Sequence, residues 1–206
     1  TAGTSQTTGD ANTSVGHGAM FATTTASDNT AVGSLALHAN TTGHSNVALG
    51  AQALENNTTA NYNVAVGLHA LHDNSTGERC NAFGADALGD NTTGNDNTAI
   101  GCNALDANTS ASNNTAVGRS ALLSNTTGHS NVAVGALALD ANTTGHSNTA
   151  VGYLSLSGET TGVRNTALGF HAGQVQDGAD DNVWVGYQCG LSNSTGEYNV
   201  GVGKDA

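Results

Sequence analysis

Residues 29–45 read NTAVGSLALHANTTGHS, and this 17-residue unit recurs along the whole 206-residue chain. We number its positions from 1, the Asn, to 17. The opening phrase, Asn followed by Thr or Val, Ala, Val and Gly, returns without an insertion. It begins at Asn12, Asn29, Asn46, Asn63, Cys80, Asn97, Asn114, Asn131, Asn148, Asn165, Asn182 and Asn199. So strict a period predicts a repeat architecture in which each unit buries its apolar face against its neighbours.

The first part of the unit alternates as a β-strand does. Thr or Val at position 2 and Val, Leu, Ile or Phe at position 4 share one face, and Ala at position 3 takes the other. Gly at position 5 and the Asn-Thr-Thr-Gly phrase at positions 12–15 are typical of corners. The chain has no Pro, as expected where every strand residue donates its N–H to the next coil.

We therefore expect an all-β fold: a β-solenoid, or β-roll, of twelve 17-residue coils that forms a single domain over residues 1–206. Each coil is expected to hold two short extended segments. The first would place the position-4 row in a thin interior, and the Asn residues at position 1 would form an amide ladder along the axis.

Composition argues against several classes of function. Sixteen acidic against four basic residues give a net charge of −12, which disfavours nucleic acid and anionic membranes as partners. No apolar stretch reaches the length of a membrane span and no leader is recognisable, so we expect no membrane insertion by this segment. No nucleophile and base recur as a pair, and the three cysteines lack metal-site spacing. We expect no catalytic residues, no cofactor and no metal.

Position 9 holds a large apolar residue in nine consecutive units, starting with Met20. Neighbours in a strand face opposite ways. If Ala at position 8 points into the roll, the position-9 row lies outside and needs a subunit interface to cover it. That prediction assigns the interface to Leu37, Leu54, Leu71, Leu88, Leu105, Leu122, Leu139 and Leu156. If Leu points inward instead, the coil is a self-sufficient monomer with a small, flat outer face.

The phrase Asn-Thr-Ala-Val-Gly-x-x-Ala-Leu, as at residues 29–37 and 97–105, resembles the head repeats of trimeric autotransporter adhesins of the YadA type. The full unit with its Asn-Thr-Thr-Gly turn is still more similar to the repeat arrays of phage-type tail-fibre domain proteins. The resemblance covers essentially residues 1–206. It implies a left-handed, homotrimeric β-roll, with the chain itself as partner. Such a roll would serve as the shaft or head of an extracellular, cell-surface or virion fibre that attaches to a host or matrix.

Candidate binding residues lie where the consensus breaks, in the tenth and eleventh units and the unit before them. Tyr153, Phe170 and Tyr187 share position 6 in three consecutive coils, and Trp184 replaces the Ala at position 3. Aromatic rings near carboxylates and amides suit sugar binding, so a surface glycan or a matrix protein is the expected ligand. The alternative is that these residues only cap or widen the end of the solenoid.

Three further patterns have weaker support. The carboxylates of Asp177, Asp180 and Asp181 could bind Ca²⁺, and His129 and His146, one coil apart, could share a metal, but solvated turns explain both sets. Thr rows at positions 13 and 14 suggest ice binding, but adjacent residues face opposite sides. We expect a rigid, acidic, non-catalytic fibre segment that attaches by avidity. The alternative is a monomeric ice-binding or purely structural spacer solenoid.

Overall fold

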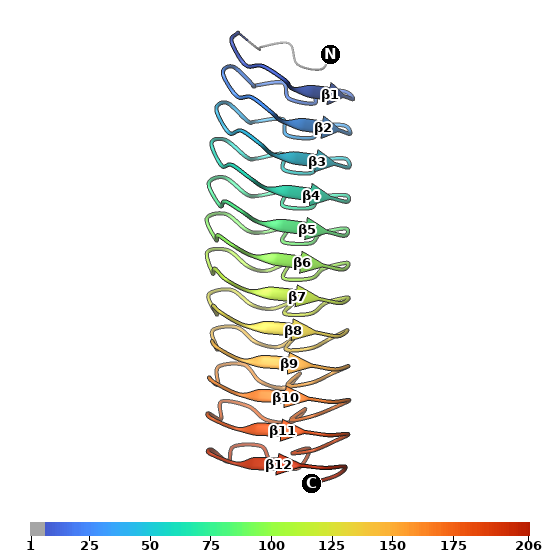
Figure 1. Ribbon diagram of the computed structural model, residues 1–206, viewed down its shortest axis with the longest axis vertical. Helices are drawn as coiled ribbons and strands as arrows, with labels where there is room; N and C mark the ends of the chain where they lie inside the picture. The colour runs from blue at the N-terminus through green and yellow to red at the C-terminus, as the bar shows by residue number, and fades with distance from the viewer. Residues whose placement is uncertain (1–6) are drawn as a thin grey trace.

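The computed structural model describes residues 7–206 as a rod of stacked coils (Figure 1). Each coil contributes one three-residue strand. The strands are β1 (Thr13–Val15), β2 (Thr30–Val32), β3 (Val47–Leu49), β4 (Val64–Val66), β5 (Asn81–Phe83), β6 (Thr98–Ile100), β7 (Thr115–Val117), β8 (Val132–Val134), β9 (Thr149–Val151), β10 (Thr166–Leu168), β11 (Val183–Val185) and β12 (Val200–Val202). The described part of the chain contains no helix that could span a membrane. The predicted all-β solenoid of 17-residue coils is confirmed.

The twelve strands form one parallel sheet in sequence order. Each residue pairs with the residue 17 positions later, as Ala99 does with Ala116. Hydrogen bonds to both neighbouring coils hold this register: Thr98 donates its N–H to Asn114 over 2.8 Å, and Gly101 donates to Phe83 over 2.8 Å. The sequence period therefore becomes the axial period of the rod, about 4.8 Å per coil.

Gly at position 5 makes the corner that ends each strand. Gly101 has a φ of +135°, and a Cβ built there would lie 2.6 Å from the carbonyl carbon of Gly118 in the next coil. Both the backbone angle and the close approach exclude other residue types. The coils can therefore stack at strand spacing only if this corner remains Gly.

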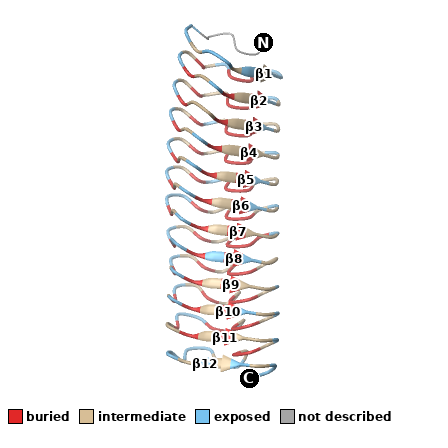
Figure 2. Cartoon of the chain, viewed as in Figure 1, coloured by how far each residue is buried: buried red, intermediate tan, exposed pale blue. Residues whose placement is uncertain are grey.

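The strand faces are the reverse of the prediction. Ala at position 3 is completely buried in the central coils, whereas positions 2 and 4 point outward, with Val32 39% and Val134 36% exposed. Figure 2 shows the same order of buried and exposed segments repeated from coil to coil. The prediction that position 4 lines the interior is therefore wrong. The interior is narrow beside the strand and accepts only a methyl group there.

The second segment is not a strand, which changes where the position-9 row lies. Leu35 and Leu37 have φ values of +58° and +52°, in the left-handed region. Left-handed residues break the two-residue alternation of a strand. As a result Ala36 and Leu37 both point inward, and both are completely buried.

The interface assigned to the position-9 leucines is consequently wrong. All of them have no exposed surface within a single chain, so they cannot contact a second chain. The residues concerned are Leu37, Leu54, Leu71, Leu88, Leu105, Leu122, Leu139 and Leu156. They form the centre of the hydrophobic core together with the Ala residues at positions 3 and 8.

Two buried rows of Asn run beside this core. At position 1 the side chain bonds to backbone: Asn97 Oδ1 accepts the N–H of Asn114 over 2.9 Å, and Asn114 Nδ2 donates to the carbonyl of Gly128 over 2.8 Å. Amide-to-amide bonds run from coil to coil at position 12, where Asn91 Nδ2 donates to Asn74 Oδ1 over 2.9 Å, and occur at position 1 only toward the two ends of the described row, as from Asn29 to Asn12. An amide ladder therefore exists, but at position 12, whereas position 1 pins the backbone of the following coil.

Cys80 is the one break in the position-1 row. Its N–H still donates to Asn63 Oδ1 over 2.9 Å, and its thiol points at the carbonyl of Gly94 over 3.3 Å, where an Asn amide would otherwise donate. Burial raises the pKa of the Cys80 thiol to about 11. The neutral thiol thus replaces the amide as a weak donor without opening the coil.

Candidate functional site

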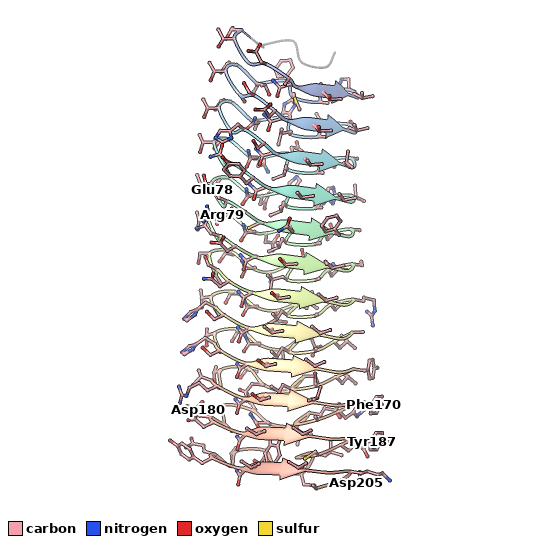
Figure 3. All side chains as sticks on the ribbon, in the orientation of Figure 1. Glu78, Arg79, Phe170, Asp180, Tyr187 and Asp205 are labelled. Carbon is pink, nitrogen blue, oxygen red and sulfur yellow. The ribbon has the colours of Figure 1, made fainter. Side chains whose placement is uncertain are left out.

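Three aromatic rings stack along one corner of the rod, directly after the Gly at position 5. Tyr153 and Phe170 have ring centroids 5.5 Å apart, and Phe170 and Tyr187 have centroids 5.3 Å apart with an interplanar angle of 4°. Each ring remains between 42% and 45% exposed. Figure 3 shows Phe170 and Tyr187 projecting outward from this corner. We call these three residues the aromatic ladder. The sequence prediction that they align along one edge is confirmed.

Stacking decides what the aromatic ladder can offer a ligand. Parallel rings at these separations are offset-stacked, so each ring partly covers the face of its neighbour. His171 stacks face to face on Phe170, with centroids 3.9 Å apart and an interplanar angle of 6°. Lys204 covers the last ring, with Nζ 5.8 Å from the centroid of Tyr187. Most ring faces are therefore used within the protein, and a ligand meets mainly ring edges.

Trp184 does not belong to this surface. It is only 5% exposed, inside the coil, and its indole N–H donates to Gln176 Oε1 over 2.7 Å. It fills the space that Gly at position 9 vacates: a Cβ on Gly190 would lie 2.3 Å from the indole ring, and one on Gly173 would lie 2.8 Å from it. The prediction of Trp184 as a surface ligand-binding residue is therefore wrong. The paired loss of Leu at Gly173 and Gly190 was the sequence signal for this repacking.

The same coils replace the buried position-12 Asn by Glu159 and then Gln176. Glu159 has no exposed surface, and its carboxylate accepts the N–H of Gly162, the N–H of Gly178 over 2.8 Å and the Gln176 side-chain amide over 3.0 Å. Several donors around one carboxylate offset its loss of solvation. Glu159, Gln176 and Trp184 thus form one buried polar chain that is structural in character.

The four cations of the chain lie in different surroundings. Arg79 makes a two-point pair with Asp96, at 2.7 and 3.0 Å, and Arg164 makes the same pair with Asp181, at 2.6 and 2.7 Å. Lys204 pairs with Asp205 at 3.4 Å. Arg119 is exposed, and within residues 7–206 its guanidinium has neither an ion pair nor a hydrogen bond.

The proposed acidic and histidine metal sites do not assemble. Asp180 accepts the N–H of Val163 over 2.8 Å and Asp181 faces Arg164, while Asp177 accepts from Thr160, so the three carboxylates do not converge. The rings of His129 and His146 stack with centroids 4.7 Å apart. In the described part of the chain no group of three or more His, Cys, Asp or Glu side chains is placed to hold a metal ion.

A polar cleft lies on the mid-section of the rod, where Gly89 takes position 10. It has a volume of about 230 Å³ and is lined by His69, His72, Asp86, Gly89, Asp90 and Asp106. The imidazoles are already partnered: His69 Nδ1 lies 3.1 Å from Asp86 and His72 Nδ1 lies 2.7 Å from Asp73. Burial, with the nearby Asp90 and Asp86, raises the pKa of the Asp106 carboxyl. Sequence reasoning did not identify this cleft, because it considered each repeat position by itself, whereas the cleft combines positions 7, 10 and 11 of three consecutive coils.

The outer side of the sheet is a further surface that sequence reasoning assigned to the interior. It consists of the position-2 and position-4 side chains of β1 to β12, which we call the outer face. Position 2 is Thr, Val or Asn and position 4 is Val, Leu, Ile or Phe. In these twelve described strands neither column contains a charged residue. In a chain with a net charge of −12, an uncharged surface that runs the length of the rod is notable.

Comparison with known proteins gives no match to a protein family, to a curated protein or to a solved structure. The similarity of the repeat to fibre proteins therefore stays a prediction. The surfaces that remain for a partner are the outer face, the aromatic ladder and the unpaired Arg119, which shares position 6 with the ladder.

Proposed function

We propose that this chain is a rigid structural and adhesive segment of an extracellular fibre, on a virion or a cell surface, and that it acts without catalysis. In this proposal copies of the chain associate through the outer face, and the trimer is the assembly that the repeat resemblance implies. The observation that carries the proposal is the continuous, uncharged and largely apolar outer face of β1 to β12.

The size of the outer face supports self-association. Twelve strands extend about 53 Å and the two columns lie about 6.6 Å apart, so the area between the column centres alone is roughly 350 Å². The largest apolar patch on a typical soluble protein measures about 300–600 Å² and is often functional, so the outer face has the size of an interaction surface. Exposed members include Val32, Leu49, Phe83, Ile100 and Leu168, at 37–49% exposure. Packing around a common axis with the same face of two other copies would remove these side chains from water.

The internal construction suits a load-bearing rod. Each internal coil is bonded to both of its neighbours by backbone hydrogen bonds, and two buried Asn rows add side-chain bonds at the same spacing. Weak sites repeated on three copies of such a rod would gain affinity through simultaneous engagement. This is the mechanism we propose for adhesion.

Sedimentation tests the assembly. We expect the chain to sediment at three times its 20.3 kDa mass. Thr115→Asp places a carboxylate on the outer face in β7 and should give a monomer, because burying an unpaired charge between chains is costly. Thr127→Asp makes the same change at exposed position 14 and should leave the mass unaltered. A monomeric wild-type chain, or a Thr115→Asp variant that keeps the full mass, would contradict the proposal.

A monomeric ice-binding solenoid is the second candidate, and one observation favours it. The outer face presents two columns on one side of a parallel sheet, with Thr30, Thr98, Thr115, Thr149 and Thr166 in the position-2 column. The Thr rows considered from sequence are less suitable, because a position-13 hydroxyl such as that of Thr92 donates to a carbonyl in the next coil over 2.8 Å. Thermal hysteresis from a monomer would support this candidate, and its absence from a trimer would support the fibre.

A further inference from the structure

Position 6 forms an external row along the corner that follows the strands. In the last six coils this row carries three aromatic rings with one basic residue on each side. One small residue separates the rings from the basic residue on the N-terminal side. The row reads Arg119, Ala136, Tyr153, Phe170, Tyr187 and Lys204. It therefore combines the aromatic ladder with positive charge, in a chain that is otherwise strongly acidic.

The two ends of the aromatic ladder differ. At the C-terminal end the outer face of the Tyr187 ring is covered by Lys204 Nζ, 5.8 Å from its centroid. At the other end Tyr153 contacts the rings of Phe170 and His171, both in the following coil, and its next neighbour along the row is position 6 of the preceding coil. That position is Ala136, a methyl group where the ladder would have its next ring. We call the space over Ala136, between Arg119 and Tyr153, the slot.

The slot has room for one flat ring stacked on Tyr153 and for an acidic substituent of that ring that reaches Arg119. Coils lie about 4.8 Å apart, so the backbones at Arg119 and Tyr153 are separated by about 9.6 Å. A ring stacked on Tyr153 takes about 3.5–4 Å of that distance. The remainder brings an acidic substituent on that ring within reach of the Arg119 guanidinium.

Arg119 is free to make that contact. Within residues 7–206 it has no ion pair and no hydrogen-bond partner, and no cation–π contact joins it to Tyr153. The other three cations are each committed to a neighbouring carboxylate. A guanidinium forms strong, paired hydrogen bonds with a carboxylate, and it would repel an ammonium group that approached the open face of Tyr153.

We propose that the slot binds an acidic sugar residue, a pyranose ring that carries a carboxylate, within an otherwise neutral glycan. The apolar face of the pyranose stacks on Tyr153, and its carboxylate pairs with Arg119. A single acidic residue is favoured over a polyanion because the net charge of −12 repels long anionic chains. The inference rests on the adhesive part of the proposed function and specifies its ligand.

Two monosaccharides test the slot by saturation-transfer NMR. Methyl glucuronide should receive saturation on its ring protons, and the neutral methyl glucoside should bind about tenfold more weakly, as expected for the loss of one charged contact. Arg119→Gln should abolish the preference between the two sugars, and Tyr153→Phe should keep it. Equal binding of both sugars to the unmodified protein would overturn the proposal.

A pair of variants separates the slot from general surface effects. Ala136→Tyr places a ring in the slot and should abolish glucuronide binding. Ala85→Tyr makes the same change at position 6 in another coil, at a similarly half-buried Ala, and should leave binding intact. Tyr already occupies position 6 in two coils, so both variants should fold. Binding that survives Ala136→Tyr would refute the slot.

The tests of the slot and of the assembly have separate readouts. The slot lies within one chain, so Thr115→Asp should remain able to bind glucuronide even as a monomer. Conversely, Ala136→Tyr should keep the sedimentation mass of the wild type. An unmodified chain that sediments as a trimer but does not bind glucuronide would refute the ligand alone, and an unmodified chain that is monomeric but binds glucuronide would refute the assembly alone.

Discussion

Trp184 offers the sharpest test of how the interior is packed. Its indole occupies the space left by Gly at position 9, and its N–H satisfies the buried Oε1 of Gln176 at 2.7 Å. Trp184→Ala should cost about 3–5 kcal/mol for the cavity and about 1–3 kcal/mol for the unpaired oxygen. Hydrogen exchange should report this loss as faster opening of β10 to β12, with β4 to β6 as the internal reference.

The reciprocal change at Gly190 completes the test. A Cβ there would lie 2.3 Å from the Trp184 ring, so Gly190→Leu alone should also destabilise these coils. The double variant restores the consensus Ala and Leu, and the φ of Gly190, +70°, is in the region that position-9 Leu residues occupy. It should therefore be more stable than either single variant. The interaction free energy of the double-mutant cycle would then be stabilising, although each single substitution is destabilising. Additive losses would show that the ring and the missing Leu are unrelated.

The remaining predictions concern single positions, each checked by urea unfolding followed by circular dichroism unless stated otherwise. Leu105→Asp should lower the free energy of unfolding by several kcal/mol, so that the chain unfolds and does not merely dissociate. Leu123→Asp, at a half-buried site, should still fold. A folded, monomeric Leu105→Asp variant would contradict the burial of the position-9 row. Cys102 should react with a thiol reagent at pH 8 and Cys80 should not. The pKa of Cys80 is raised to about 11 in the folded state, so its contribution to stability is full below its usual value of 9.0 and is lost as the pH rises from 9 to 11; stability that does not fall over that range would contradict this. Burial raises the pKa of Asp106, so Asp106→Asn should stabilise the chain at pH 7 and have no effect at pH 3, where the carboxyl is protonated in both states; an equal effect at both pH values would exclude a charge-based cause.

Repetition made the coil, its register and the sheet order predictable from sequence alone. A strict period of 17 residues leaves one way to align neighbouring coils, and the alternation at positions 2 to 4 identifies the strand. The same reasoning correctly placed Tyr153, Phe170 and Tyr187 in one external row. These features depend only on spacing, which a sequence records directly.

The inward or outward direction of each row was not predictable in the same way. Ala and Val alternate whichever of them faces the core, so the pattern at positions 2 to 4 fits both orientations. At position 9 the left-handed backbone of residues such as Leu37 turns Ala and Leu to the same side. Leu seldom adopts the left-handed conformation, because its Cβ then lies too close to the following carbonyl oxygen. Residue propensity therefore gives no reason to expect this conformation at position 9. Complete burial of the Leu side chain offsets that cost.

Breaks in the consensus have different meanings inside and outside the coil. Trp184 breaks an inner row, and Gly190 breaks another row so as to accommodate it, which marks a repacked core. Position 6 instead varies from coil to coil, from His17 to Lys204, without a matching change elsewhere. An external corner residue contacts no core, so it can change at little cost in stability. Unmatched external breaks are therefore where a repeat protein can acquire a ligand, and Ala136 beside Tyr153 is such a place.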